Sequence, residues 1–118
     1  MHTFYYLSTC DTCKRILKEL NLPETVQKVD LKKTPLTLAQ VESLKERSGS
    51  YEALFSKRAQ LYKQRNLKDH KLNEIDYKNL LLEHYTFLKR PVLVSDSDIF
   101  IGNTAKTIAA AKAFLDEQ

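Results

Sequence analysis

The pattern of apolar and polar residues divides the chain into strands and helices. Residues 3–7 are rich in threonine, phenylalanine and tyrosine and predict a strand, and residues 26–30 alternate as a second strand would. Between them a helix should end near Asn21-Leu22-Pro23, because apolar residues recur at helical spacing at Cys13, Ile16, Leu17 and Leu20. This βαβ unit predicts two parallel strands with a right-handed crossover.

The middle of the chain, residues 35–84, reads as a mainly helical block. Thr37-Leu38-Ala39-Gln40 fits a capping box, and a short helix is expected around residues 58–64, after a break at residues 48–50. Asn73 fits the cap of a stronger helix. The pattern places His84 on the apolar face of that helix, as a core histidine, with Tyr77, Leu80 and Leu81.

After residue 91 the sequence returns to strand character. Val92-Leu93-Val94 and Ile99-Phe100-Ile101 predict a hairpin, and a last helix should pack inward through Ile108, Ala111 and Leu115. The resulting order resembles that of thioredoxin with helices inserted in the middle. We therefore expect an α/β protein with a thioredoxin-like fold and a mixed four-stranded sheet. Residues 1–118 should form a single domain, with a thioredoxin-like portion at 1–34 and 85–118 and a helical insertion at 35–84.

Composition excludes several classes of protein. Of 118 residues, 42% are hydrophobic and 29% charged, a globular balance, and no apolar run approaches the roughly 20 residues that span a bilayer. The first residues do not resemble a signal peptide, so we expect the protein in the cytoplasm, without membrane contact. We also expect a monomer. The net charge of +4 is scattered, which predicts no direct nucleic-acid contact and fits a solvated surface or an oxyanion substrate.

The two cysteines carry the candidate chemistry. Cys10-Asp11-Thr12-Cys13 lies where a strand passes into a helix, and a thiolate there meets free backbone amides that lower its pKa. We expect Cys10 to be the nucleophile. Cys13 is predicted to face inward, as a resolving thiol or simply as a small buried apolar residue. A zinc site would be a third interpretation, but the chain has no second Cys-x-x-Cys and no histidines at zinc-finger spacing, so no metal is expected.

Arg90-Pro91 precedes a predicted strand, at the point where thioredoxin-like folds place a cis-proline beside the reactive cysteine. Proline favours the trans form by only about 0.5 to 1 kcal/mol, so we expect Pro91 to be cis. Arg90 should then point toward Cys10.

Three runs of sequence resemble the arsenate reductase (ArsC) family, which includes the Spx transcription regulators. They are residues 8–14, 56–58 and 83–91, and the resemblance covers nearly the whole chain in order and spacing. It implies that Cys10 attacks the substrate and that Arg58 and Arg90 bind the oxyanion, with Thr12 and Pro91 completing the substrate-binding set. Thr12 should also serve the helix start through its hydroxyl.

The resemblance further implies that no cofactor is bound and that glutathione is a co-substrate, with glutaredoxin or thioredoxin as reductant. The substrate would be a small oxyanion or a disulfide. Arsenate reductases of this type carry a further arginine where this chain has Ile101-Gly102-Asn103, so we expect weak arsenate binding, improved by an arginine at Gly102. The Cys-x-x-Cys pair leaves an alternative open. Spx proteins use such a pair as a redox switch and bind the RNA polymerase alpha subunit.

Overall fold

A computed structural model of the protein describes residues 2–117. The chain forms two compact units, one of residues 2–34 and 90–117 and the other of residues 35–89. Within the described range no helix is both long and apolar enough to cross a membrane.

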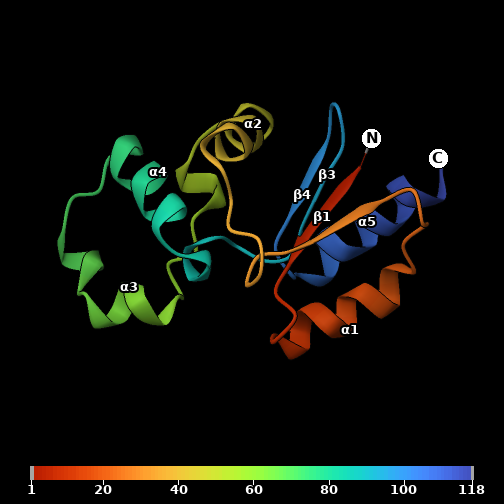
Figure 1. The fold of residues 1–118 in the computed structure, drawn as a ribbon, viewed down its shortest axis with the longest axis horizontal. Helices are drawn as coiled ribbons and strands as arrows, with labels where there is room; N and C mark the ends of the chain where they lie inside the picture. The colour runs from red at the N-terminus through yellow and green to blue at the C-terminus, as the bar shows by residue number, and fades with distance from the viewer. Residues whose placement is uncertain (1, 118) are drawn as a thin grey trace. The chain divides into compact units, whose positions relative to one another are not determined.

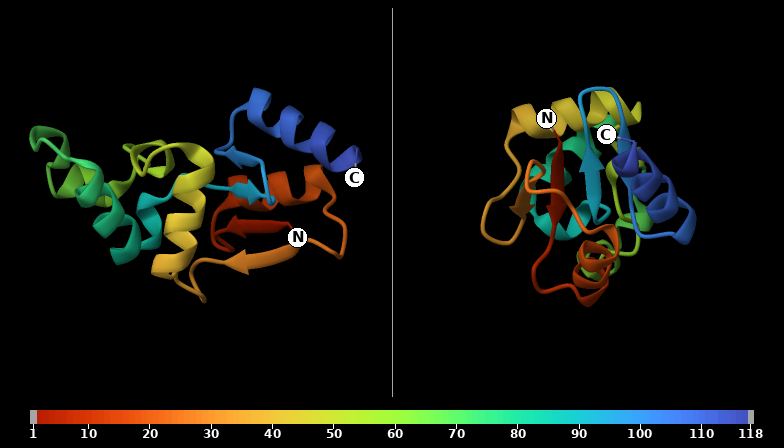
Figure 2. Two further views of the ribbon diagram at one scale, coloured as in Figure 1. Left: turned by 90° about the horizontal axis from the view of Figure 1, so that it is seen from above. Right: turned by 90° about the vertical axis from the view of Figure 1, so that its right-hand side faces the viewer.

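The first unit is built on a mixed sheet of four strands, β1 (Thr3–Tyr6), β2 (Gln27–Asp30), β3 (Val92–Val94) and β4 (Ile99–Ile101). Their order across the sheet is β2-β1-β3-β4 (Figures 1 and 2). β1 and β2 are parallel, whereas β3 is antiparallel to both β1 and β4. The expected fold class and the parallel pairing of the first two strands are confirmed.

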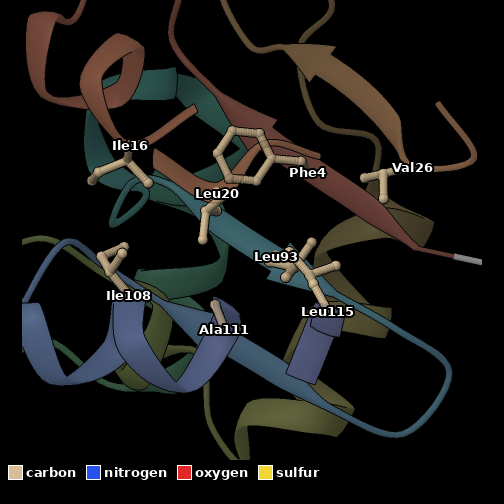
Figure 3. Packing of buried hydrophobic residues seen from close by; sticks show 8 residues of the cluster. All are labelled: Phe4, Ile16, Leu20, Val26, Leu93, Ile108, Ala111 and Leu115. Carbon is tan, nitrogen blue, oxygen red and sulfur yellow. The ribbon is translucent and has the colours of Figure 1, made fainter. Parts of the chain in front are cut away.

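Helices α1 (Asp11–Leu20) and α5 (Ala105–Asp116) enclose the core of this unit with the sheet (Figure 3). α1 contributes residues spaced three or four apart, which line one side of a helix. It ends where Asn21 takes the left-handed conformation, with φ of 48°. α5 is capped by Thr104, whose hydroxyl accepts a hydrogen bond from the Thr107 amide at 3.2 Å. The core consists of Phe4, Ile16, Leu20, Val26, Leu93, Ile108, Ala111 and Leu115.

The second unit is helical. Its helices are α2 (Leu38–Ser48), α3 (Gln60–Gln64) and α4 (Glu74–Glu83), joined by short 3₁₀ turns. The predicted capping box of α2 is confirmed, with Thr37 and Gln40 as its members, and Asn73 caps α4 as expected. The ring of Phe55 lies at the centre of the apolar interior, and its centroid is 4.9 to 5.8 Å from those of Tyr62, Tyr77 and Phe87.

Two expectations for this unit were wrong in detail. The short helix begins at Gln60 rather than Arg58, because residues 56–59 form a turn. His84 is half-buried rather than a core residue of α4, since the helix ends at Glu83 and the backbone of His84 is extended. Its Nδ1 accepts a hydrogen bond from the Thr86 amide at 3.0 Å, so the ring caps the turn that follows.

The core of the first unit depends on Ile16, which is fully buried. Ile16→Ala should lower the free energy of unfolding by about 2 to 5 kcal/mol, because the lost contacts leave a cavity. Ile75 is 67% exposed on α4, so the matched Ile75→Ala should change it by no more than about 0.5 kcal/mol. Urea denaturation measures both, and equal effects would contradict the assignment of Ile16 to the core.

Candidate thiol site

Cys10 lies between the first strand and the first helix, at the N-cap position of α1. Residues 7–10 form a turn in which the Cys10 amide donates to the Leu7 carbonyl at 3.0 Å. The Cys10 carbonyl accepts from the Lys14 amide at 3.1 Å, which begins the hydrogen bonding of the helix. Because both backbone groups of Cys10 are fixed, its side chain is held at the start of the helix. The side chain is half-buried, so the sulfur remains within reach of a small molecule.

The surroundings of Cys10 favour its thiolate. Partial burial raises the pKa of the thiol, but the Cys13 amide, the Cys13 thiol, the positive charge of Arg90 and the Thr12 amide together lower it below the ordinary value. No hydrogen bond of regular capping geometry joins the Cys10 side chain to α1, so the amides act on the sulfur chiefly as oriented dipoles. A cysteine with a lowered pKa is a stronger nucleophile at neutral pH, since more of it is ionised.

Cys13 has the opposite environment. It lies one turn into α1, is completely buried and is not bonded to another cysteine. Burial, together with the interaction with Cys10, raises the pKa of its thiol to about 11, although a backbone hydrogen bond from Leu7 and the charge of Arg90 lower it. At neutral pH Cys13 is therefore a protonated thiol that can donate a hydrogen bond to the Cys10 sulfur.

Arg90 and Pro91 lie in the same unit as the cysteines. The peptide bond between them is cis, as the sequence predicted. Pro91 is buried, and its carbonyl accepts a hydrogen bond from the Gly102 amide at 2.9 Å. The half-buried Arg90 places its positive charge where it lowers the pKa of both Cys10 and Cys13. An anion bound at Cys10 would meet the same charge.

Thr12 is half-buried in the first turn of α1 and acts on the site through its backbone. Its amide lowers the pKa of Cys10, whereas the N-cap position expected to use the Thr12 hydroxyl is occupied by Cys10 itself. The role predicted for the hydroxyl at the helix start was wrong, because the N-cap is Cys10, two residues before Thr12. Whether Thr12 also contacts substrate stays a prediction.

Arg58 belongs to the other unit, in the turn before α3, and its side chain is exposed. The neighbouring Lys57 is bound to Glu52 through an ion pair of 2.7 Å. Within residues 2–117 no such partner holds the Arg58 guanidinium. The expected convergence of Arg58 with Arg90 on Cys10 stays a prediction.

Asp30 is a residue of the site that sequence reasoning missed. It ends β2, directly opposite Tyr6 of β1, and its Oδ1 accepts hydrogen bonds from the amides of Ser8 at 3.1 Å and Lys32 at 3.2 Å. The sequence did offer a signal for Asp30. It is an acidic residue at the end of the second strand, which runs parallel to the strand that leads to Cys10. In the described part of the chain no three histidine, cysteine or acidic side chains gather as metal ligands would.

Comparison with known proteins places the chain in a family. A model of the ArsC family matches residues 5–111, so the chain belongs to that family. No curated protein matches the chain by sequence.

Solved structures share the fold. Arsenate reductase from Vibrio cholerae is 20% identical with a TM-score of 0.77, and 93% of this chain and 96% of that one are covered. A possible arsenate reductase from Streptococcus mutans is 31% identical with a TM-score of 0.64, covering 84% and 87%. An arsenate reductase (ArsC) related protein from Brucella melitensis is 20% identical with a TM-score of 0.69, covering 92% of each chain.

The opposite pKa shifts of the two cysteines predict a reactivity that depends on pH. The Cys10 pKa is lowered, so its alkylation by iodoacetamide should reach its plateau at a lower pH than that of a free thiol. Cys13, with a pKa of about 11, should react appreciably only in strong alkali. Site-resolved mass spectrometry after timed alkylation measures both profiles, with free cysteine as the reference. Equal profiles with midpoints near ~8.5 would contradict the assignment of Cys10 as the nucleophile.

Proposed function

We propose that the protein is a thiol-dependent reductase of the arsenate reductase type, which acts in the cytoplasm on a small oxyanion or disulfide through the Cys10 thiolate. The observation that supports this most directly is the asymmetry of the cysteine pair. One sulfur is accessible with a lowered pKa, and the other is buried with a pKa of about 11. The related structures named as arsenate reductases support arsenate as the oxyanion to test first.

The proposed reaction transfers two electrons. The Cys10 thiolate attacks the arsenic of arsenate, a sulfur–arsenic bond forms, and one arsenate oxygen leaves as water after taking up protons. A second thiolate, from glutathione or Cys13, then attacks the Cys10 sulfur. The new disulfide forms as the sulfur–arsenic bond breaks, and its electron pair stays on arsenic, which departs as arsenite. The two thiols lose two electrons, and glutaredoxin or thioredoxin reduces the resulting disulfide.

Formation of the adduct would itself activate Cys13. Part of the rise in the pKa of Cys13 comes from its hydrogen bond to Cys10 and from the negative charge of the Cys10 thiolate. Both influences end when the Cys10 sulfur is bonded to substrate and loses its charge. The Arg90 charge, which lowers the pKa of Cys13, remains in place. The resolving thiol therefore ionises more readily after the first step where Arg90 neutralises the negative charge of the bound oxyanion.

Arg90 is the proposed oxyanion ligand in the cysteine unit, and Arg58 the second by family resemblance. An arginine fork binds an oxyanion through two parallel hydrogen bonds, which a lysine cannot reproduce. The suggested third arginine at Gly102 does not fit the backbone. Gly102 has φ of 93°, a conformation that residues with side chains rarely adopt. Arginine at the exposed Asn103 avoids that constraint.

The Cys-x-x-Cys pair also supports a second candidate function, an Spx-like regulator that senses oxidants and binds the RNA polymerase alpha subunit. The observation in its favour is the direct interaction between the two sulfurs. A hydrogen-bonded pair can close into a disulfide with little rearrangement, provided that its geometry can be reached. Binding to the carboxy-terminal domain of the alpha subunit, with Cys10 and Cys13 reduced or oxidised, would distinguish a regulator from an enzyme.

The test of the enzyme is arsenite production from arsenate with glutathione and glutaredoxin. Cys10→Ser should abolish it, because a serine hydroxyl is not ionised at neutral pH. Cys13→Ser should lower turnover by about tenfold or more if Cys13 resolves the adduct, and should leave it nearly unchanged if glutathione does. Wild-type protein without turnover, tested also on glutathione mixed disulfides, would exclude the proposed enzyme. The mass of peroxide-treated protein, which drops by two hydrogens on closure of the pair, provides an independent readout.

Loss of the Arg90 fork should weaken anion binding at Cys10. A charge-assisted hydrogen bond contributes about 1.5 to 3 kcal/mol, so Arg90→Ala should reduce arsenate protection of Cys10 against iodoacetamide about tenfold or more. Arg90→Lys should restore only part of it. Arg58→Ala in parallel tests the second ligand. The matched control is Arg47→Ala, since the Arg47 guanidinium binds the Ser43 carbonyl and hydroxyl in α2. Unchanged protection in Arg90→Ala would contradict the proposed role.

A further inference from the structure

The carboxylate of Asp30 is bonded to the chain segment that carries Cys10. Its Oδ1 accepts the amide of Ser8, 22 positions earlier in the sequence, at 3.1 Å, and the amide of Lys32 at 3.2 Å. The Ser8 hydroxyl, and to a lesser extent the Lys33 charge, hold the pKa of Asp30 below its usual range despite some desolvation. Asp30 is thus ionised at neutral pH, and a charged acceptor binds two neutral amide donors.

The position of Asp30 follows from the pairing of the two parallel strands. Tyr6 and Asp30 are the last paired residues of β1 and β2, and the Leu31 amide donates to the Tyr6 carbonyl at 2.9 Å. Beyond this point the two segments leave the sheet. After the backbone hydrogen bonds between β1 and β2 end, the side chain of Asp30 still binds the segment that follows β1, through the amide of Ser8.

The segment held by Asp30 is bonded to the backbone of Cys10 and to the side chain of Cys13. Residues 7–10 form the turn before α1, with the Cys10 amide bonded to the Leu7 carbonyl. A backbone hydrogen bond from Leu7 acts on Cys13. Ser8, which follows Leu7 in this turn, is the residue bound by Asp30. A displacement of this turn would therefore move the Cys10 sulfur relative to the amides of α1, and the Leu7 amide relative to Cys13.

We infer that Asp30 is a positioning residue, which fixes the turn of residues 7–10 and thereby holds the Cys10 sulfur against the first amides of α1. This inference rests on the proposed role of Cys10 as the nucleophile. Asp30 does not touch the reacting atoms, and its effect passes through the amide and hydroxyl of Ser8.

An effect of the Asp30 charge and an effect of its position predict opposite changes in the rate of Cys10 alkylation. If Asp30 acted only as a nearby negative charge, its removal would favour the Cys10 thiolate and speed alkylation. If it acts by holding the turn, removal of the acceptor oxygen should slow alkylation. The substitution Asp30→Asn keeps an acceptor oxygen at the same place and loses the charge. Asp30→Glu keeps the charge and displaces the oxygen by roughly one carbon–carbon bond, about 1.5 Å.

The experiment compares the pH profile of Cys10 alkylation in wild type and variants of the full chain, with site-resolved mass spectrometry. Asp30→Ala should lower the rate at pH 7 by about threefold to tenfold, and Asp30→Glu should lower it by a smaller factor. Asp30→Asn should stay within about twofold of wild type. The matched control is Asp76→Ala, which removes a carboxylate that accepts the Asn73 amide at 2.9 Å at the start of α4 in the other unit. It should destabilise the protein without moving the Cys10 profile.

Each outcome decides a different question. An unchanged or faster Cys10 in both Asp30→Ala and Asp30→Glu would overturn the positioning role while leaving the proposed function intact. A wild-type profile equal to that of free cysteine would overturn the proposed nucleophile and this inference with it. If Asp30→Ala does not fold, Asp30→Glu and Asp30→Asn still test the inference. Asp30→Glu, which displaces the acceptor oxygen, should slow alkylation of Cys10, whereas Asp30→Asn, which keeps the oxygen in place, should not. A slowing equal to that of Asp76→Ala would reduce the effect to general destabilisation and overturn the inference.

Discussion

The structure of the reactive site depends on the free backbone amides at the start of α1. The first turn of any helix leaves amides without intrahelical partners, and here the Cys10 sulfur lies at the N-cap in front of them. These amides point along the helix axis, and the burial of Cys13, Ile16 and Leu20 fixes the position of that axis in the unit. The core of the unit therefore orients the dipoles that act on the sulfur.

The same burial separates the two thiols chemically. A three-residue step along a helix keeps both side chains on one side but carries the second one a turn deeper, so Cys13 loses its contact with water while Cys10 keeps part of it. Desolvation disfavours a thiolate in both, yet only Cys10 receives enough from amides and Arg90 to overcome it. One spacing thus yields both a thiol with a lowered pKa and a protonated thiol beside it.

The features of the fold that the sequence predicted correctly are those that depend on a few neighbouring residues. The capping box at Thr37, the cap at Asn73 and the strands on either side of α1 each follow from a few neighbouring residues, and the cis bond before Pro91 follows from the thioredoxin-like order. Contacts between distant segments were not predictable in this way. The Asp30 to Ser8 hydrogen bond, between residues 22 positions apart, needs the register of β1 against β2.

Under the proposed function, the backbone at the end of β4 limits which residues can bind an anion in this unit. Gly102 donates its amide to the carbonyl of Pro91, the residue after Arg90, and it does so from a left-handed conformation with φ of 93°. Nothing lies within 4 Å of a Cβ built there, so the obstacle to a side chain is conformational rather than steric. A glycine is therefore favoured at this turn, and an arginine could not occupy it without strain. Within the cysteine unit, Arg90 and the amides of α1 are the proposed sources of charge for an oxyanion, and they are the same groups that lower the pKa of Cys10. A bound anion and the Cys10 thiolate consequently compete for the same positive groups, which are Arg90 and the amides of α1. An uncharged or singly charged substrate should be bound more readily beside the thiolate than a dianion.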